Sequence, residues 1–447
     1  MTGKATWTRP KAIVVGLFRD PQKMWEMQED LAELRRLVED AGAEVVAVVT
    51  QHRRAPHPGF YVGKGKAREI ASLVRETGAE MVVFDDSLRP VQVKHLEDTI
   101  GVKILDRVQL ILDIFARRAR TREGQLQVEL AQLQYLLPRL TGRGIELSRL
   151  GGGIGTRGPG ETLLEMKQRR IRDRIRHIRE ELRRIAAHHA HLHRERREKS
   201  IPVFALVGYT NAGKSTLFNR LTGAGVHAQD QLFTTLEPRV RKVQLGDLGM
   251  VLVSDTVGFI RKLPPWLVAA FRATLDEVYE SDALIHVIDI TSSRMQTEIA
   301  TVERILKGMR VHEKPILRVF NKIDLLDRAD PLLEVRVRNP EAIFVSARTG
   351  EGIETLLFAM EDVLHRAIRA DSAKHWQRAE FYIPYPDMAK VQWFYRVGRI
   401  LHREDRDGGV YIVAEVPQWL IGRMQAYRVV SEVTPAPASS AASSRSS

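Results

Sequence analysis

The sequence predicts an α/β protein in which two parallel-sheet domains are separated by a long helical hairpin and followed by a small α+β module. Short β-branched runs alternate with helical stretches over residues 1–110 and again over 201–370, which is typical of strands covered by helices. Between these segments, apolar residues recur at spacings of four and three, which indicates two helices packed along each other. A chain of 447 residues is long enough for about three domains with their own cores.

The first segment, residues 1–110, contains four short apolar runs that we expect to be parallel strands, namely KAIVVG, AEVVAVV, EMVVFD and VKIL. Helical stretches over residues 30–41 and 66–77 lie between them. Because strands and helices alternate, the helices are expected to cross over the sheet and cover it, which makes this segment an N-terminal α/β domain.

Residues 111–200 are predicted to form an antiparallel helical hairpin. Pro138 is expected to bend or end its first helix, and Thr162 with Glu165 forms a capping box that would start the second. The two apolar seams are Leu126, Leu130, Leu133, Leu137 and Leu140 on the first helix, and Ile171, Ile175, Ile178, Leu182 and Ile185 on the second. A glycine-rich basic loop joins the helices and carries Arg143, Arg149 and Arg157.

The chain has a formal net charge of +13 and a pI of about 9.9, which favours a polyanionic partner such as nucleic acid or an anionic membrane face. Much of this charge lies in KQRRIRDRIRHIREELRR on the second hairpin helix, which we interpret as an RNA-facing surface. Cysteine is absent, which excludes disulfides, thiolate metal sites and cysteine nucleophiles. Nothing resembles a signal peptide or a membrane span, so we expect a cytoplasmic protein.

The C-terminal end is expected to hold a small α+β module over residues 371–435, which contains FYIPY, KVQWFYRVGRILH and GGVYIVAEV. The last residues, 436–447, are rich in alanine and serine, and we predict a disordered tail.

A phosphate-binding loop opens the segment 201–370. VFALVG is predicted to be a buried strand, and the chain continues through the pattern G-x-x-x-x-G-K-S into a helix, which is the context that such a loop requires. Backbone N–H groups and the Lys214 ammonium would hold nucleotide phosphates there, and Ser215 would coordinate Mg²⁺. The expected contacts come from Gly208, Asn211, Ala212, Gly213, Lys214, Ser215 and Thr216.

Two further motifs are typical of a switch that senses Mg²⁺ and the γ-phosphate. FTTLEP supplies two hydroxyls, of which we favour Thr235 over Thr234 for the Mg²⁺ shell. In DTVG, which follows an apolar strand, Asp255 would hold Mg²⁺ through a water molecule, and the Gly258 amide would contact the γ-phosphate. The predicted metal-binding residues are therefore Ser215, Thr235 and Asp255.

A guanine pocket is predicted from NKID, residues 321–324, which ends the apolar strand PILRVF. The Asp324 carboxylate can accept two hydrogen bonds from the N1–H and amino groups of guanine, a pair of donors that adenine lacks. Asn321 would support the loop, Lys322 would lie along the base, and the backbone of Ser346 and Ala347 would bind the guanine O6. The ordered motifs together predict a P-loop GTPase domain that binds GTP and GDP.

The residue after DTVG is Phe259, which can neither donate nor accept a hydrogen bond. Since many GTPases orient the attacking water with a glutamine at this position, water orientation here must come from elsewhere. No residue of the sequence can be identified as the catalytic base, and we predict slow hydrolysis until an external contact orders the switches.

With these motifs, the chain resembles the HflX family of ribosome-associated GTPases. The resemblance extends beyond the GTPase motifs to YVGKGK, LDIFARRARTREGQLQVELAQLQYLLPRL and GGGIGTRGPGE. It implies a protein, expected to be monomeric, that binds the large ribosomal subunit and splits or rescues stalled ribosomes with ribosome-stimulated hydrolysis. It also implies that the loop with Arg143, Arg149 and Arg157 reaches ribosomal RNA near the peptidyl-transferase centre.

Two alternatives remain open from the residues. One is a GTP-gated switch that recruits a protein or a membrane, although the hairpin lacks the aromatic apolar face of an interfacial anchor, so any membrane association would be weak. The other is an RNA-remodelling ATPase whose N-terminal domain binds ATP at Gly63–Lys66, a segment that lacks the rest of a phosphate loop.

Overall fold

The computed structural model of the protein describes residues 9–143, 159–198, 201–223, 233, 235, 238–246, 249–264, 266–267, 276–326, 329–372 and 376–429. The chain divides into two compact units, residues 1–197 with 201–358 and residues 198–200 with 359–447. The first unit holds two parallel-sheet folds and a helical hairpin, and the second holds a small antiparallel sheet, so the predicted fold class is confirmed.

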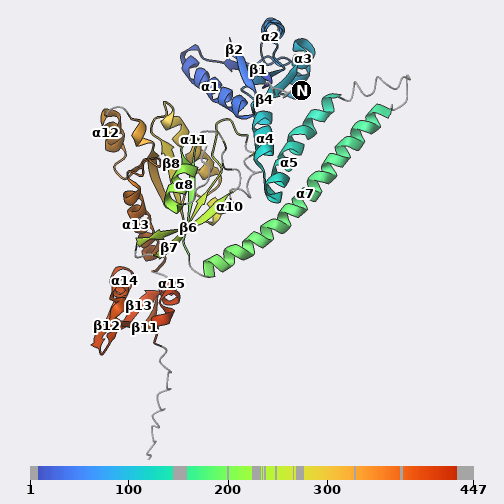
Figure 1. Cartoon of the computed structure of the whole chain (residues 1–447). Coiled ribbons are helices and arrows are strands. Elements are labelled where there is room, and N and C mark those ends of the chain that lie inside the picture. Colours follow the sequence, from blue (N-terminus) through green and yellow to red (C-terminus); the bar gives the residue numbers. More distant parts are fainter. Residues whose placement is uncertain are drawn as a thin grey trace, which may run out of the picture. The chain divides into compact units, whose positions relative to one another are not determined.

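The N-terminal sheet contains four parallel strands in the order β2-β1-β3-β4 (Figure 1). Its strands are β1 (Lys11–Phe18), β2 (Glu44–His52), β3 (Met81–Phe84) and β4 (Lys103–Asp106). Helices α1 (Met24–Asp40) and α4 (Arg107–Arg118) pack on one face, and α2 (Lys64–Thr77) and α3 (Pro90–Ile100) pack on the other. Alternation along β1 explains this layering, because Ala12 and Val14 join the first apolar cluster whereas Ile13 and Val15 join the second.

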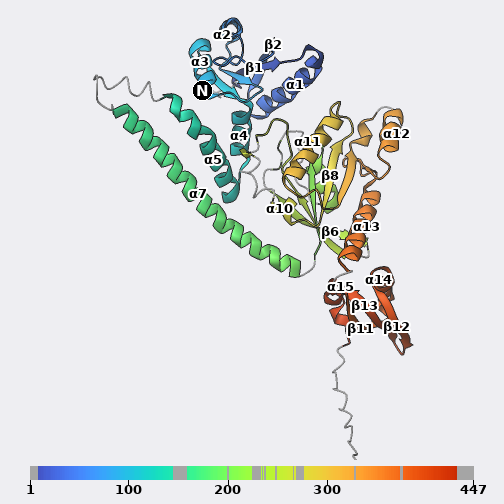
Figure 2. The ribbon, with the colours of Figure 1, turned by 180° about the vertical axis from the view of Figure 1, so that it is seen from behind.

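The helical hairpin is formed by α5 (Arg122–Leu136), the 3₁₀ segment η2 (Leu137–Arg143) and α7 (Pro159–Glu198), and α5 and α7 lie side by side (Figure 2). The predicted seam is confirmed except for Leu140, since Leu126, Leu130, Ile175 and Ile178 are buried together and the other seam residues pack around them. Arg174 pairs with Glu129 across the seam through two hydrogen bonds of 2.6 and 2.7 Å.

The structure tests two sequence signals, one for the end of the first hairpin helix and one for the start of the second. The α-helical geometry of α5 ends at Leu136, immediately before the Leu137–Pro138 pair, as Pro138 predicts. The capping-box prediction at Thr162 is wrong, because α7 already begins at Pro159. Proline is favoured at the first helical position, where its missing N–H would be unsatisfied in any case, so the helix can start three residues earlier.

The GTPase sheet has the order β10-β9-β8-β5-β7-β6, and only β6 runs antiparallel. The strands are β5 (Val203–Gly208), β6 (Arg239–Leu245), β7 (Gly249–Asp255), β8 (Ala283–Asp289), β9 (Ile316–Asn321) and β10 (Ile343–Phe344). The helices are α8 (Lys214–Thr222), α10 (Asp276–Glu280), α11 (Met295–Gly308), α12 (Ala329–Arg338) and α13 (Ile353–Ser372). Because β5, β7, β8 and β9 are parallel, the motifs at their carboxyl ends meet at one edge of the sheet.

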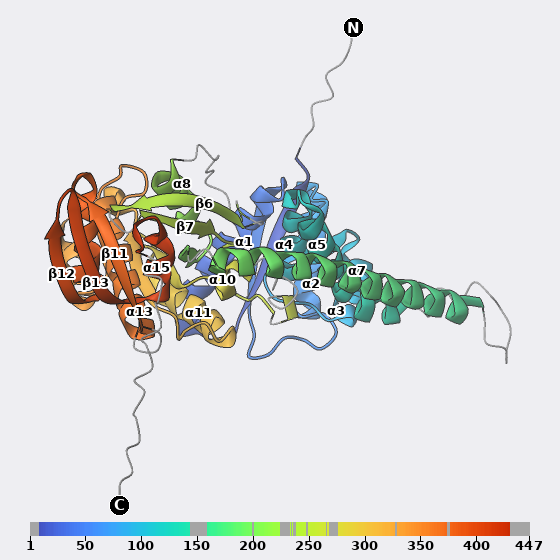
Figure 3. The ribbon, with the colours of Figure 1, turned by 90° about the horizontal axis from the view of Figure 1, so that it is seen from below.

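The second unit contains an antiparallel sheet in the order β11-β13-β12, formed by β11 (Trp376–Pro384), β12 (Arg399–Arg406) and β13 (Gly409–Pro417) (Figure 3). Helices α14 (Val391–Val397) and α15 (Gln418–Arg423) accompany it, and Phe381 of β11 contacts Phe394 of α14 with ring centroids 4.8 Å apart. Within the described ranges, none of the helices combines the length and apolar character needed to traverse a lipid bilayer.

Candidate functional site

Two glycines give the phosphate loop its shape. Gly213 has a φ of +92°, and a Cβ there would lie 2.2 Å from the Asn321 amide nitrogen. Gly208 has a φ of +154°, and its Cβ would lie 2.3 Å from the Val287 carbonyl oxygen. Any larger residue would clash with the neighbouring strands β8 and β9, so both positions need glycine to keep the backbone N–H groups directed at the phosphates.

Lys214, the first residue of α8, is buried at the centre of the loop. Its Nζ donates hydrogen bonds to the carbonyl oxygens of Gly208 at 3.1 Å and Tyr209 at 2.7 Å. Burial lowers the pKa of Lys214 to about 8, against the opposing effect of the Asp255 carboxylate. A bound triphosphate would add negative charge beside this ammonium group and favour its charged form.

The three predicted metal-binding side chains converge. The Ser215 and Thr235 hydroxyls lie 2.9 Å apart, and each donates to Oδ2 of Asp255 at 2.7 Å. Oδ1 of the same carboxylate is buried and accepts no hydrogen bond from the described residues. Burial raises the pKa of Asp255, although Thr235, Ser215 and Lys214 oppose this effect.

This donor set fits Mg²⁺, which is held in nucleotide sites by one or two carboxylates, hydroxyls, water and the phosphates of the substrate. The buried Oδ1 of Asp255 accepts no hydrogen bond from the described residues, and a bound cation would favour the charged carboxylate. When bound, Mg²⁺ would neutralise charge on the β- and γ-phosphates, with Ser215 and Thr235 as ligands and Asp255 acting through water.

The switch segment after β7 lies directly against the phosphate loop. A Cβ at Gly258 would be 2.9 Å from both the Lys214 Nζ and the Thr210 Cα, so only glycine lets the backbone approach this closely. The next residue, Phe259, accepts a hydrogen bond from Thr210 N at 2.7 Å and donates one to the Gly208 carbonyl at 3.0 Å. The Gly258 backbone therefore lies beside the lysine that would hold the γ-phosphate.

The side chain of Phe259 faces away from this site. It is 3% exposed and belongs to the apolar cluster formed by strands β5 and β8 and helices α10 and α11, with Val207, Leu284 and Val302 among its members. A side chain at this position is part of the core of the domain and cannot reach a water molecule at the phosphate loop.

Hydrogen bonds connect the NKID segment with Ser346, Ala347 and the phosphate loop. Asn321 donates to the Ala212 carbonyl and accepts from the Ala347 N–H, both at 2.9 Å, so it ties the phosphate loop to the loop after β10. Asp324 accepts from the Ser346 hydroxyl at 2.6 Å, which orients its carboxylate. This arrangement can present a carboxylate and the Ala347 backbone to one edge of a guanine base.

One functional residue in the base pocket was not predicted. Asp289, at the end of β8, pairs with the Lys322 ammonium at 2.6 Å. Lys322 has a φ of +70°, which is unusual for a residue other than glycine, and this ion pair helps to hold it. The position of Asp289 at the carboxyl end of a buried strand is the sequence signal that could have indicated it.

The other predicted residues are placed as follows. Asn211 lies in the loop with a φ of +63°, and Thr216 lies in the first turn of α8. Thr234, Arg149 and Arg157 lie outside the described residues, whereas Arg143 is the last residue of η2. Gly63–Lys66 cap and begin α2, and the Gly63 N–H already donates to Gln51 Oε1 at 2.8 Å.

Similarity to known proteins extends over most of the chain. Residues 28–116 match the family described as "GTP-binding GTPase N-terminal", residues 118–197 match "GTP-binding GTPase Middle Region", and residues 203–322 match "50S ribosome-binding GTPase". The protein named GTPase HflX of Caldanaerobacter subterraneus subsp. tengcongensis is 46% identical over 409 residues, which cover 91% of each chain. GTPase HflX of Escherichia coli (strain K12) is 47% identical over 360 residues, which cover 79% of this chain and 84% of that protein.

A solved structure is also similar at lower identity. The crystal structure of a GTP-binding protein from the hyperthermophilic archaeon Sulfolobus solfataricus in complex with GDP is 28% identical, with a TM-score of 0.43. The match covers 80% of this chain and 99% of that protein.

Proposed function

Since the chain belongs to the HflX family of GTPases, we propose that it binds the large ribosomal subunit in its GTP form and splits or rescues stalled ribosomes. The protein hydrolyses GTP to GDP and phosphate, and its GTPase domain matches the 50S ribosome-binding GTPase family. Hydrolysis is slow in the free protein and is accelerated by the ribosome, which then allows release of the subunit. The protein acts as a cytoplasmic monomer.

One observation carries the ribosome-dependent part of this proposal. The phosphate loop and the Ser215–Thr235–Asp255 set are assembled, yet the residue after Gly258 is buried in the core. The free protein thus has the groups that bind phosphates and Mg²⁺ but lacks a side chain at this position to orient water. A large ribonucleoprotein partner that contacts the switches can supply that orientation.

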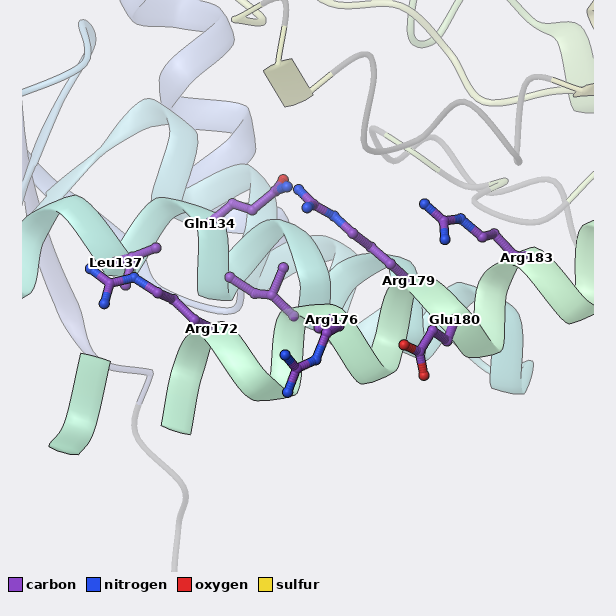
Figure 4. A pocket seen from close by; sticks show the side chains of 8 residues that line it. Gln134, Leu137, Arg172, Arg176, Arg179, Glu180 and Arg183 are labelled. Carbon is purple, nitrogen blue, oxygen red and sulfur yellow. The ribbon is translucent and has the colours of Figure 1, made fainter. Parts of the chain in front are cut away.

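A groove between α5 and α7 supports RNA as the partner surface (Figure 4). It has a volume of about 520 Å³, and Leu137 and Ile175 provide its apolar part. Gln134, Glu180 and four arginines that recur once per turn of α7 also line it; the arginines are Arg172, Arg176, Arg179 and Arg183. Such a row of exposed guanidinium groups fits the phosphate backbone of RNA.

The four arginines of this groove differ in whether they have partners within the protein. Arg176 pairs with Asp173 on the same helix at 2.9 Å, and Arg172 donates to Gln168 at 3.2 Å. Arg179 and Arg183 are exposed, and neither forms an ion pair with any of the described residues. In Figure 4, Arg179 extends toward Gln134 of α5. We infer that these two arginines contact RNA phosphates.

The double variant Arg179→Gln/Arg183→Gln tests this surface. We expect it to weaken binding to purified large subunits and to reduce the slope of log affinity against log salt concentration by roughly 2, one per lost phosphate contact. Nucleotide affinity should not change, because neither residue lies near the phosphate loop. The measurement is sedimentation with large subunits at several salt concentrations.

The control is Arg318→Gln/Arg338→Gln, which removes two exposed arginines of the GTPase domain that are paired with Glu303 and Glu334. It changes the net charge by the same amount but leaves the groove intact. The salt slope should therefore be the same as in the native protein. Equal slopes for the native protein and the Arg179/Arg183 variant would exclude this groove as a phosphate-binding surface.

The central experiment is a titration of GTP hydrolysis with purified large ribosomal subunits. We expect the turnover rate to rise by at least tenfold and to saturate, because each ~1.4 kcal/mol of switch ordering gives a factor of ten. Binding should be tighter with a non-hydrolysable GTP analogue than with GDP or without nucleotide. A turnover rate that does not respond to subunits, or equal binding in all nucleotide states, would contradict the proposed function.

A further inference from the structure

The N-terminal sheet has a cluster of three carboxylates at the position where sheets of this type bind ligands. In open parallel sheets, ligands bind at the carboxyl ends of adjacent strands from which the chain leaves in opposite directions. In the order β2-β1-β3-β4, that position lies between β1 and β3. Asp85 and Asp86 follow β3 there, and Asp30 of α1 lies nearby; Asp30 and Asp85 are 8% and 4% exposed.

A side chain of the GTPase domain reaches this carboxylate cluster. Lys262, four residues after Gly258, directs its Nζ to Asp86 Oδ1 at 3.0 Å, to Asp30 Oδ2 at 3.3 Å and to the carboxylate of Asp85. Its neighbour Arg261 pairs with Asp30 at 2.9 Å. Burial alone would lower the pKa of Lys262, but Asp85, Asp86 and Asp30 outweigh it and raise that pKa.

A second connection joins the same segment to the phosphate loop. The Tyr209 hydroxyl donates to Glu33 of α1 at 2.7 Å and accepts from the Arg261 backbone N–H at 2.9 Å. Tyr209 directly follows Gly208, so one side chain of the phosphate loop contacts both the switch segment and the N-terminal domain. Tyr209, Val257 and Ile260 also belong to the apolar cluster that contains α1 and α4 of the N-terminal domain.

The switch segment is therefore anchored at two places directly after Gly258, the position that would contact the γ-phosphate. Phe259 holds it to the phosphate loop through two backbone hydrogen bonds, and Arg261 and Lys262 hold it to the N-terminal carboxylates. Lys262 has a φ of +58°, a conformation that is unfavourable for a lysine and that needs compensation from its surroundings. Loss of the ammonium contacts would remove that compensation and let the segment move.

We propose that Lys262 is a positioning residue for GTP binding, because its contacts with Asp30, Asp85 and Asp86 hold the Gly258 amide where the γ-phosphate arrives. When the γ-phosphate binds to an amide that is already in place, less conformational entropy of the switch segment is lost. GDP lacks the γ-phosphate and makes no use of that amide. The N-terminal domain thus contributes to the preference of the GTPase domain for GTP over GDP without contacting the nucleotide.

The test compares nucleotide affinities of the full chain and its Lys262→Met variant by fluorescence titration. We expect the affinity for a non-hydrolysable GTP analogue to fall by about tenfold and that for GDP to stay within about twofold. Lys262→Arg should restore most of the loss, because it keeps the positive charge near the carboxylates. Asp30→Asn, which changes the carboxylate cluster instead of the switch segment, should lower the GTP-analogue affinity selectively in the same way.

Lys307→Met is the matched control, because Lys307 is an exposed lysine in the last turn of α11. It should leave both affinities unchanged, and unchanged GDP binding in every variant shows that the protein is folded. An unaltered ratio of GTP-analogue to GDP affinity in Lys262→Met would overturn the proposal. Failure of Lys262→Arg to recover the ratio, or the same loss in Lys307→Met, would do so as well.

Discussion

Asp324→Asn is expected to lower the affinity for GTP by about three orders of magnitude and to create affinity for xanthosine triphosphate. The carboxylate can accept hydrogen bonds from the N1–H and amino groups of guanine, and each such bond to a charged group contributes about 1.5–3 kcal/mol. An asparagine offers one acceptor and one donor, which match the N1–H and the C2 carbonyl of xanthine. Ser346, which donates to Asp324 Oδ1 at 2.6 Å, can still orient the amide.

Equilibrium binding of GTP, xanthosine triphosphate and ATP to the native and variant proteins measures this effect. Asp324→Ala provides the control, because it removes the acceptors without adding a donor. It should lose affinity for GTP without gaining affinity for xanthosine triphosphate. Retention of GTP affinity in Asp324→Asn would mean that the base does not bind at the NKID loop. A gain of ATP affinity in place of xanthosine triphosphate would contradict the hydrogen-bond argument.

Phe259→Gln is expected to lower the free energy of unfolding by about 3 kcal/mol and to leave intrinsic GTP hydrolysis slow. The substitution places an amide without partners in the apolar cluster with Val207, Leu284 and Val302, and it removes aromatic contacts there. The glutamine cannot orient water, because the backbone at this position is held to Gly208 and Thr210 with its side chain turned into the core. Denaturant unfolding and single-turnover hydrolysis measure the two effects.

Phe259→Leu separates packing from polarity, since leucine keeps the position apolar and should cost about 1 kcal/mol. Its hydrolysis rate should equal that of the native protein. A Phe259→Gln protein that is as stable as the native one and hydrolyses GTP rapidly without ribosomes would show that the side chain can turn toward the phosphates.

The residues of the phosphate loop and the base pocket could be predicted because each motif is a short continuous segment with its own local geometry. G-x-x-x-x-G-K-S requires only a strand, a turn and a helix, and the structure forms all three within residues 203–222. The same holds for the hairpin seam, where spacings of four and three along each helix are enough to identify the buried side. The start of α7 was misplaced, since proline and a capping box are both valid start signals and the sequence does not rank them.

The direction in which Phe259 points could not be predicted from its neighbours in the chain. DTVGF indicates a switch, but whether the next side chain faces the nucleotide or the core depends on hydrogen bonds to a loop about fifty residues earlier. Asp289 was missed for a related reason, because its partner Lys322 follows the adjacent strand β9 and is not nearby in the sequence.

By itself, the sequence determined the fold class, the family and the residues that we expect to surround the phosphates and the base, since these depend on local patterns of glycine, lysine, hydroxyl and carboxylate side chains. Only the tertiary structure decided that Lys262 lies among carboxylates of the N-terminal domain and that Tyr209 joins that domain to the phosphate loop. Those contacts bring together residues more than 170 positions apart, for example Tyr209 with Glu33 and Lys262 with Asp85. Charged side chains that lie so far apart in the sequence acquire a specific partner only when packing of the folded chain excludes water and fixes the distance between them.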